Sequence, residues 1–436
     1  MSAIELSLLL TVMLLAILGS GIWIFVGIIL VSLICQIFIL GFPLPRIGQF
    51  VQSLAWRSLN SWELSAIPLF LIMGEITART DIADRLLRGL TPWLEPVPGR
   101  LLHANVYGST IFAAVSGSST ATTSAVGRVT LPVLKERGYS QSLSLGSLAG
   151  AGSLGLLIPP SIIMIIYGIL AEVSIAKLFI GGILPGLLIA AIYSLYIGIR
   201  CVINPELSPS ADQRFTRKDY LHSLLEIVPF GLLIVAVLGG IYSGLTTPSE
   251  AAAVGVAATL LIVIVTGQMS WAMLRDSISS AMRVSCMICL IVAAAAMLSS
   301  TLGFLHIPRD VANAIRAMEP SPYFLILLIG LLYLGLGLFL DGISIAVMTL
   351  PITLPLIVAA GFDPLWFGIF LVVTIEAGLI TPPVGLNLFV LQGITGHKLG
   401  VVAVASFPFF VLLVAAAALI TIFPEIVLSL PRLISN

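Results

Sequence analysis

Charged residues are scarce in this chain. Only 9% of its 436 residues are Asp, Glu, Lys or Arg, whereas 59% are hydrophobic, and the mean hydropathy is +1.15. Soluble domains carry about 25% charged and about 45–50% apolar residues, so a soluble fold is excluded. The 20 basic and 20 acidic residues balance to zero net charge. They sit in short loops, which excludes a nucleic-acid-binding surface.

Residues that usually form disulfides, metal centres and nucleotide sites are also few or badly placed. The four cysteines lie in or beside apolar runs, where thiols behave as small buried hydrophobic groups (Cys35, Cys201, Cys286 and Cys289). The four histidines are scattered (His103, His222, His306 and His397). Gly150, Gly152 and Gly155 match G-x-G-x-x-G, but no strand precedes them, and no P-loop motif occurs. A disulfide framework, a dinucleotide site and P-loop ATP hydrolysis are therefore excluded.

Long apolar runs dominate the chain. They fall near residues 4–18, 22–40, 63–78, 104–124, 142–170, 178–199, 222–244, 250–267, 284–304, 323–358, 366–394 and 401–422. A helix of about 17–25 apolar residues crosses a hydrocarbon core of about 30 Å. We therefore predict an all-α polytopic membrane protein. The first run lacks the basic start and cleavage site of a secretory signal, so it is predicted to be a retained span.

A double-proline segment occurs twice. GLLIPPS at 155–161 has its counterpart 223 residues later in GLITPPV at 378–384. At the same offset, VTLPVLKERGY at 129–139 pairs with ITLPLIVAAGF at 352–362. The chain is therefore predicted to contain an internal repeat with a broken helix in each copy.

The distribution of Lys and Arg predicts opposite orientations for the two copies. Basic residues flank the segment around SGSST (116–120) on both sides, which predicts a re-entrant hairpin and a cytoplasmic linker at 201–220. The second hairpin tip, near DGIS (341–344), has no basic residue on its trailing flank and is predicted to enter from outside. We predict inverted repeats at 1–200 and 221–436. They would supply about ten spans, two hairpins and two broken helices, with both termini periplasmic.

The breaks suggest ion binding. Each proline pair frees backbone carbonyls, and an unsatisfied carbonyl in hydrocarbon costs several kcal/mol. The hairpin tips add further oxygens (Ser116, Gly117, Ser118, Ser119 and Thr120 in one copy; Asp341, Gly342 and Ser344 in the other). Mostly neutral oxygens suit Na⁺ better than a transition metal, so one sodium site per repeat is predicted. The alternative is that the prolines only kink the helices and the small residues only permit close packing.

Two carboxylates fall within predicted membrane segments, Asp341 at a hairpin tip and Glu376 before the second break. Intramembrane carboxylates are functional candidates by default. Either could instead hydrogen-bond a helix terminus, and Glu376 could simply tie the break to its neighbours.

Several ordered motifs resemble one protein family over nearly the whole chain. They are SGSSTATTSAVGRVTLPVLKERGY, GLLIPPSIIMIIYGI, SIAKLFIGGILPGLL, GIYSGLTTPSEAAAVGV and GLITPPVGLNLFVLQGI. Together they resemble the large membrane subunit, the DctM-like permease, of the tripartite ATP-independent periplasmic (TRAP) transporters. The resemblance implies import of an organic acid such as a C4-dicarboxylate or sialic acid, driven by a sodium gradient. It further implies an elevator motion and no enzymatic activity.

The resemblance also implies site positions. The first sodium site would involve Ser116, Gly117, Ser119, Gly155, Ile158 and Ser161, and the second Gly342, Gly378, Thr381 and Val384. Substrate contacts are expected at Ser116, Ser118, Asp341, Gly342 and Asn387. Thr381 corresponds to Ile158 in the repeat, so the first site would depend more on backbone and serine oxygens.

Partners follow from the same resemblance. A small four-helix membrane subunit, expected as a separate chain, and a soluble periplasmic binding protein would act with this chain in the bacterial inner membrane. One alternative is a stand-alone sodium–carboxylate carrier of related fold. Another is an intramembrane enzyme with a nucleophilic serine in SGSST, but the apolar core offers that serine no paired base.

Overall fold

The computed structural model describes residues 9, 12–13, 16–17, 20–209, 215–317 and 321–434. Within these residues, every regular element is a helix. Seven helices of these ranges are long and apolar enough to cross a membrane: Gln141–Ala171, Ile175–Ile203, Arg217–Tyr242, Pro248–Val265, Trp271–Phe304, Gly342–Ala359 and Leu399–Ile422. The predicted all-α multi-span class is confirmed, while the count of ten spans stays a prediction. Most of the run at 4–18, and linker residues 210–214, lie outside the described residues.

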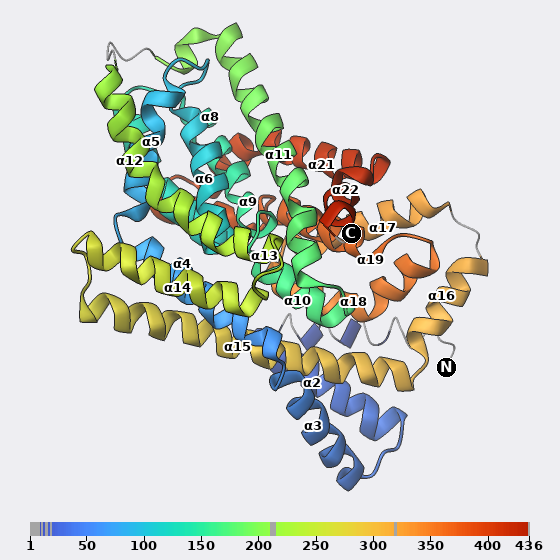
Figure 1. Cartoon of the computed structure of the whole chain (residues 1–436). Helices are drawn as coiled ribbons and strands as arrows, with labels where there is room; N and C mark the ends of the chain where they lie inside the picture. Colours follow the sequence, from blue (N-terminus) through green and yellow to red (C-terminus); the bar gives the residue numbers. More distant parts are fainter. Residues whose placement is uncertain are drawn as a thin grey trace.

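The helices follow the apolar runs closely (Figure 1). Those of the first half are α2 (Ile24–Ile34), α3 (Leu44–Leu59), α4 (Ala66–Arg79), α5 (Ile82–Leu94), α6 (Leu102–Ser116), α7 (Ser119–Glu136), α8 (Gln141–Gly152), α9 (Leu154–Leu157), α10 (Ile162–Ala171) and α11 (Ile175–Ile203). Those of the second half are α12 (Arg217–Ile234), α13 (Gly240–Tyr242), α14 (Pro248–Val265), α15 (Trp271–Phe304), α16 (Ile307–Ala317), α17 (Pro322–Gly337), α18 (Gly342–Ala359), α19 (Pro364–Leu379), α20 (Leu386–Thr395), α21 (Leu399–Ile422) and α22 (Glu425–Ile434).

Four amphipathic helices were not anticipated from the sequence: α3, α5, α16 and α22. Each mixes apolar and charged residues, so a search for long apolar runs passes over it. The apolar side of α5 is buried, with α12 packed against this helix. These four helices are not among those long and apolar enough to cross a membrane.

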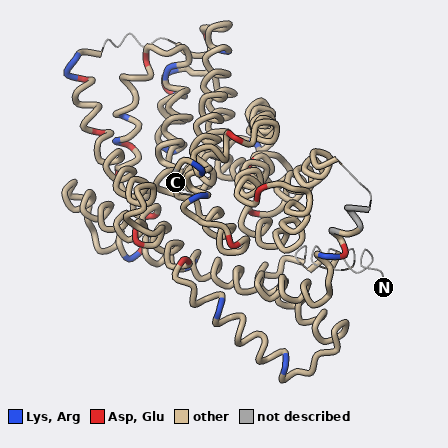
Figure 2. The backbone as a smooth tube through the Cα atoms, turned by 45° about the vertical axis from the view of Figure 1, so that its right-hand side comes forward, with Lys and Arg blue, Asp and Glu red and all other residues tan. Residues whose placement is uncertain are grey.

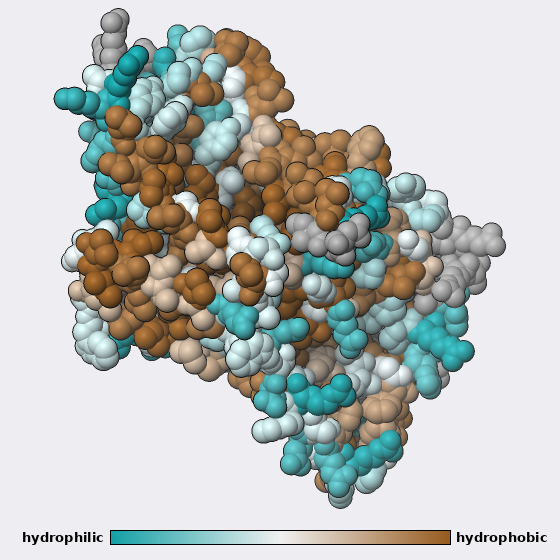
Figure 3. All heavy atoms as spheres, in the orientation of Figure 1, coloured by the Kyte–Doolittle hydropathy of each residue, from teal (hydrophilic) through white to brown (hydrophobic). Residues whose placement is uncertain are grey.

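The helices form two groups, and the members of each group pack against one another. In one, α4 packs against both α14 and α15, and α2 also packs on α15. In the other, α8 packs along α21, α6 along α7 and α8, and α17 along α19. Figure 2 shows long stretches of helix with no charged residue. Figure 3 shows broad hydrophobic areas on the molecular surface. Exposed apolar side chains of the described residues include Leu195, Leu225 and Val265. Exposed apolar area of this extent fits a lipid environment.

The first hairpin turns sharply between α6 and α7. Gly117 has a φ of +60°, a conformation that favours glycine. The Ser118 hydroxyl then accepts a hydrogen bond from the N–H of Ala121 and caps α7. The turn lies within the predicted tip at 116–120.

The second hairpin turns between α17 and α18. The Asp341 carboxylate accepts hydrogen bonds from the N–H groups of Ile343 and Ser344 and so caps α18. The connecting residues are therefore 338–341. Of the predicted tip at 341–344, only Asp341 belongs to the turn, because residues 342–344 already form the first turn of α18.

Both double prolines interrupt a helix. The first break separates α9 from α10 at residues 158–161, and the second separates α19 from α20 at residues 380–385. The bond between the two prolines is cis in each. The Ser161 hydroxyl donates to the carbonyl of Leu156 at 2.5 Å, and the Thr381 hydroxyl donates to that of Ala377 at 2.7 Å. Hydroxyls beside the breaks thus satisfy part of the freed backbone, and both retain lone pairs.

Candidate functional site

The tip of the first hairpin lies against the first break. A methyl group added at Gly155 would lie 2.6 Å from the carbonyl oxygen of Ser118, and one added at Gly117 would lie 2.8 Å from that of Pro160. Only glycine permits such a close approach of two backbones. The oxygens of Ser116 to Ser119 are therefore held beside the carbonyls of 155–161.

The second hairpin meets the second break in a similar way. Gly337, the last residue of α17, lies against Gly378, and a methyl group on either would sit 2.7 Å from the other's Cα. The N–H of Val384 donates to the carbonyl of Leu338 at 3.1 Å. The turn at 338–341 is thus joined to the break at 380–385 by backbone contacts.

Each tip also contacts the opposite half of the chain. The Ser119 hydroxyl donates to Oε2 of Glu376 at 3.1 Å and accepts a hydrogen bond from Nδ2 of Asn387 at 2.6 Å. A methyl group on Gly342, at the start of α18, would lie within 3.5 Å of the side chains of Ile163 and Leu156. The two tips and the two breaks therefore converge on one buried region.

The predicted site residues differ in their contacts and in their positions relative to the tips and breaks. Ser116 pairs with the Thr122 hydroxyl at 2.7 Å, and Ser118 lies 3.3 Å from that of Thr120. Asp341 uses its carboxylate to cap α18, and the Ser344 hydroxyl also donates to it. The remaining predicted positions lie in a break, in a helix next to a break, or at the start of a hairpin's second helix (Ser119, Gly155, Ile158, Ser161, Gly342, Gly378, Thr381, Val384 and Asn387).

Glu376 is the side chain that the predicted site omitted. It is 1% exposed, and no other Asp, Glu, Lys or Arg in the described part of the chain is fully buried. Its position as a carboxylate within a predicted membrane segment was a signal of function, but its contact with Ser119, 257 residues away in the chain, could not be predicted from that signal. The described ranges contain no group of three or more His, Cys, Asp and Glu that could hold a metal ion. An ion in this region would have to use hydroxyl, amide, carbonyl and single carboxylate oxygens.

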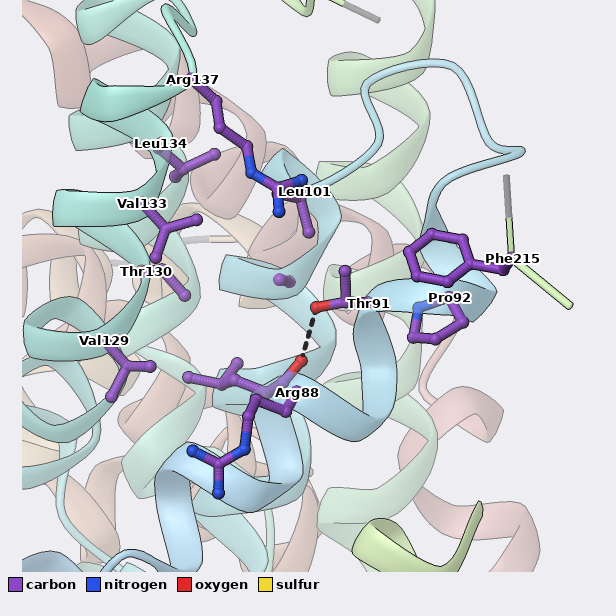
Figure 4. A pocket seen from close by; sticks show the side chains of 12 residues that line it. Arg88, Thr91, Pro92, Leu101, Val129, Thr130, Val133, Leu134, Arg137 and Phe215 are labelled. Carbon is purple, nitrogen blue, oxygen red and sulfur yellow. Dashed lines mark hydrogen bonds between the residues drawn. The ribbon is translucent and has the colours of Figure 1, made fainter. Parts of the chain in front are cut away.

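A separate cavity of about 320 Å³ lies between α5 and α7 (Figure 4). Its lining is mainly apolar, with Arg88 and Arg137 among the lining residues. The dashed line in Figure 4 marks the Thr91 hydroxyl donating to the carbonyl of Leu87 at 2.9 Å. None of the predicted site residues lines this cavity, so it is distinct from the region where the tips and breaks meet.

Comparison with known proteins agrees with this architecture. Residues 9–426 match the family model described as "Tripartite ATP-independent periplasmic transporter, DctM component". The C4-dicarboxylate TRAP transporter large permease protein of Pseudomonas aeruginosa is 36% identical over 88% of this chain and 90% of that protein. The isethionate TRAP transporter permease protein DctMQ of Oleidesulfovibrio alaskensis is 33% identical over 86% of this chain but 59% of that longer protein.

A solved structure with a similar fold is that of the YdaH transporter of Alcanivorax borkumensis. The TM-score is 0.61 at 14% sequence identity, over 86% of this chain and 88% of that one. At this identity the likeness concerns the fold alone. The helical arrangement thus recurs in a membrane transporter of very different sequence.

Proposed function

This chain belongs to the DctM component family of the tripartite ATP-independent periplasmic transporters, and from that premise we propose that it imports an organic acid by sodium symport. It is a transporter permease and not an enzyme. The substrate class is taken to be a carboxylate, such as a C4-dicarboxylate or sialic acid. One similar permease is named for C4-dicarboxylates and another for the sulfonate isethionate, so the common feature is a small organic anion.

The observation that carries the proposal is the meeting of two hairpin tips with two broken helices. In the first, hydroxyls of Ser116 to Ser119 lie beside the backbone of 155–161; in the second, Gly342 and the turn before it lie beside Gly378, Thr381 and Val384. Neutral oxygens concentrated at the membrane interior match the preference of Na⁺. Discontinuous helices facing each other across a repeat are typical of ion-coupled transporters.

The sodium dependence is open to a direct test. Proteoliposome uptake of a labelled carboxylate is expected to fall to background when external sodium is replaced by potassium at fixed membrane potential. The reason is that potassium, being larger, does not fit oxygens spaced for sodium and cannot couple its gradient to transport. Imposing a potassium gradient of equal size serves as the control. Uptake that is undiminished in potassium contradicts the symport.

The partners are likewise proposed. A small four-helix membrane subunit and a periplasmic binding protein would complete the transporter. The word tripartite in the family description supports this, and so does the longer DctMQ relative, of which this chain covers 59%. Uptake is expected only when a matching binding protein and small subunit are added to the proteoliposomes. Efficient uptake by this chain alone would instead support the stand-alone carrier.

The transport motion is proposed from the same geometry. Residues 1–200 and 221–436 would be inverted repeats joined by a cytoplasmic linker at 201–220 in the bacterial inner membrane. The hairpins and broken helices would move together as one unit against the group containing α4, α14 and α15. Close backbone contacts at Gly155 and Gly378 support a single moving unit, because each tip packs directly against its break and cannot shift relative to it.

A further inference from the structure

Glu376 and Asn387 lie on either side of the second break and both bind the same hydroxyl of the first hairpin. We propose that they form a third sodium position, which lies beside the first proposed position and shares Ser119 with it. This inference rests on the proposed sodium symport. It assigns a charged ligand to a transporter whose other proposed ion contacts are neutral.

The three side chains form a hydrogen-bonded chain with Ser119 at its centre. Ser119 is the first residue of α7, Glu376 lies near the end of α19, and Asn387 lies in the first turn of α20. All three are at most 2% exposed. Ser119 Oγ is 3.1 Å from Oε2 of Glu376 and 2.6 Å from Nδ2 of Asn387.

Counting hydrogens fixes how these groups are oriented. A serine hydroxyl has one hydrogen, and a carboxylate can only accept. Ser119 therefore donates to Glu376 and must accept from the amide nitrogen of Asn387. This leaves Oε1 of Glu376 and Oδ1 of Asn387, both buried and both without a hydrogen-bond partner in the described ranges.

Each of the two unpartnered oxygens lacks a hydrogen-bond donor or a cation. A buried carboxylate that receives a single hydrogen bond is costly in hydrocarbon, and none of the ion pairs found among the described residues includes Glu376. A cation that touches both Oε1 and Oδ1 satisfies the carboxylate and the amide together.

The chemistry of the donors selects the ion. Both unpartnered atoms are hard oxygens, neither nitrogen nor sulfur from His or Cys is present among the three residues, and one negative charge balances one monovalent ion. Because the ligands come from both sides of the second break and touch the first hairpin, an ion there would hold the two halves of the chain together.

The test of the third sodium position measures sodium binding to the purified chain in detergent. Isothermal titration calorimetry is used at constant ionic strength, with potassium as the balancing ion. E376Q keeps the size of the side chain but removes its charge. The number of sodium ions bound per chain is expected to fall by about one, and the Hill coefficient for sodium in uptake to fall accordingly. The matched control is T374V on the same helix. Its hydroxyl bonds only the carbonyls of Phe370 and Leu371, so sodium binding stays unchanged.

A charge-relocation variant separates ion binding from a purely structural role. In E376Q/N387D the glutamine amide donates to Ser119 and Ser119 donates to the new carboxylate, so both hydrogen bonds and one negative charge are retained. The double variant is expected to regain the sodium ion that E376Q lost. If E376Q does not fold in potassium, the double variant carries the test alone and must bind as many ions as the wild type.

The outcomes also separate the two proposals. No sodium binding by the wild-type chain would overturn the symport itself. Two results would overturn only the third position. One is that E376Q binds as many sodium ions as the wild type, and the other is that the double variant folds but lacks the ion.

Discussion

Gly337→Ala is expected to lower sodium-driven uptake at least about tenfold, which corresponds to about 1.4 kcal/mol. The added methyl group would lie 2.7 Å from Cα of Gly378 and 3.3 Å from the carbonyl oxygen of Ile375. Both neighbours are backbone atoms of α19, so they cannot move aside as a flexible side chain would. The second hairpin tip would be pushed off the break that it contacts. Initial uptake rates in proteoliposomes over a range of sodium concentrations measure the loss.

The matched control lies in the same helix. A methyl group on Gly335 would meet no atom within 4 Å, and alanine is about 1 kcal/mol better than glycine inside a helix. Gly335→Ala is therefore expected to transport like the wild type and to be equally or more stable. Normal rate and normal sodium dependence in Gly337→Ala would show that the tip does not need to sit against Gly378.

Gly146→Ala is expected to give a large loss of stability. The added carbon would lie 2.1 Å from the carbonyl oxygen of Ala405 and 3.0 Å from the ring of Phe409. α8 packs along α21 at this point, so the two helices would have to separate. Overpacking of this kind costs about 1–3 kcal/mol, and more where only backbone can yield. The midpoint of thermal unfolding in detergent should fall by several degrees.

Gly400→Ala in α21 is the control for that measurement. Gly400 is exposed, and a methyl group there meets no atom within 4 Å, so its unfolding midpoint should match the wild type. Equal midpoints for the Gly146 and Gly400 variants would mean that the close contact between α8 and α21 is not needed for stability.

Local sequence pattern was enough to predict the long apolar helices. Apolar runs of spanning length located the long helices, because the bilayer fixes the length that a helix needs. The residues of the first hairpin turn were also readable, because Gly117 can adopt a positive φ and Ser118 can cap a helix. The amphipathic helices were missed because the average hydropathy of a segment does not show whether its apolar residues lie on one side of a helix. The second tip was expected at 341–344, but residues 342–344 form the first turn of α18, because the Asp341 carboxylate caps that helix.

The sequence by itself determined that this is a helical membrane protein with two double-proline breaks, because composition and spacing act locally along the chain. Only the tertiary structure decided what those breaks face. The hydrogen bonds from Ser119 to Glu376 and from Asn387 to Ser119 join residues 257 and 268 positions apart. No local pattern encodes such a pairing, because it depends on how the two halves pack against each other. The same packing turned Glu376 from a single acidic residue in an apolar run into the one fully buried charged side chain of the described structure.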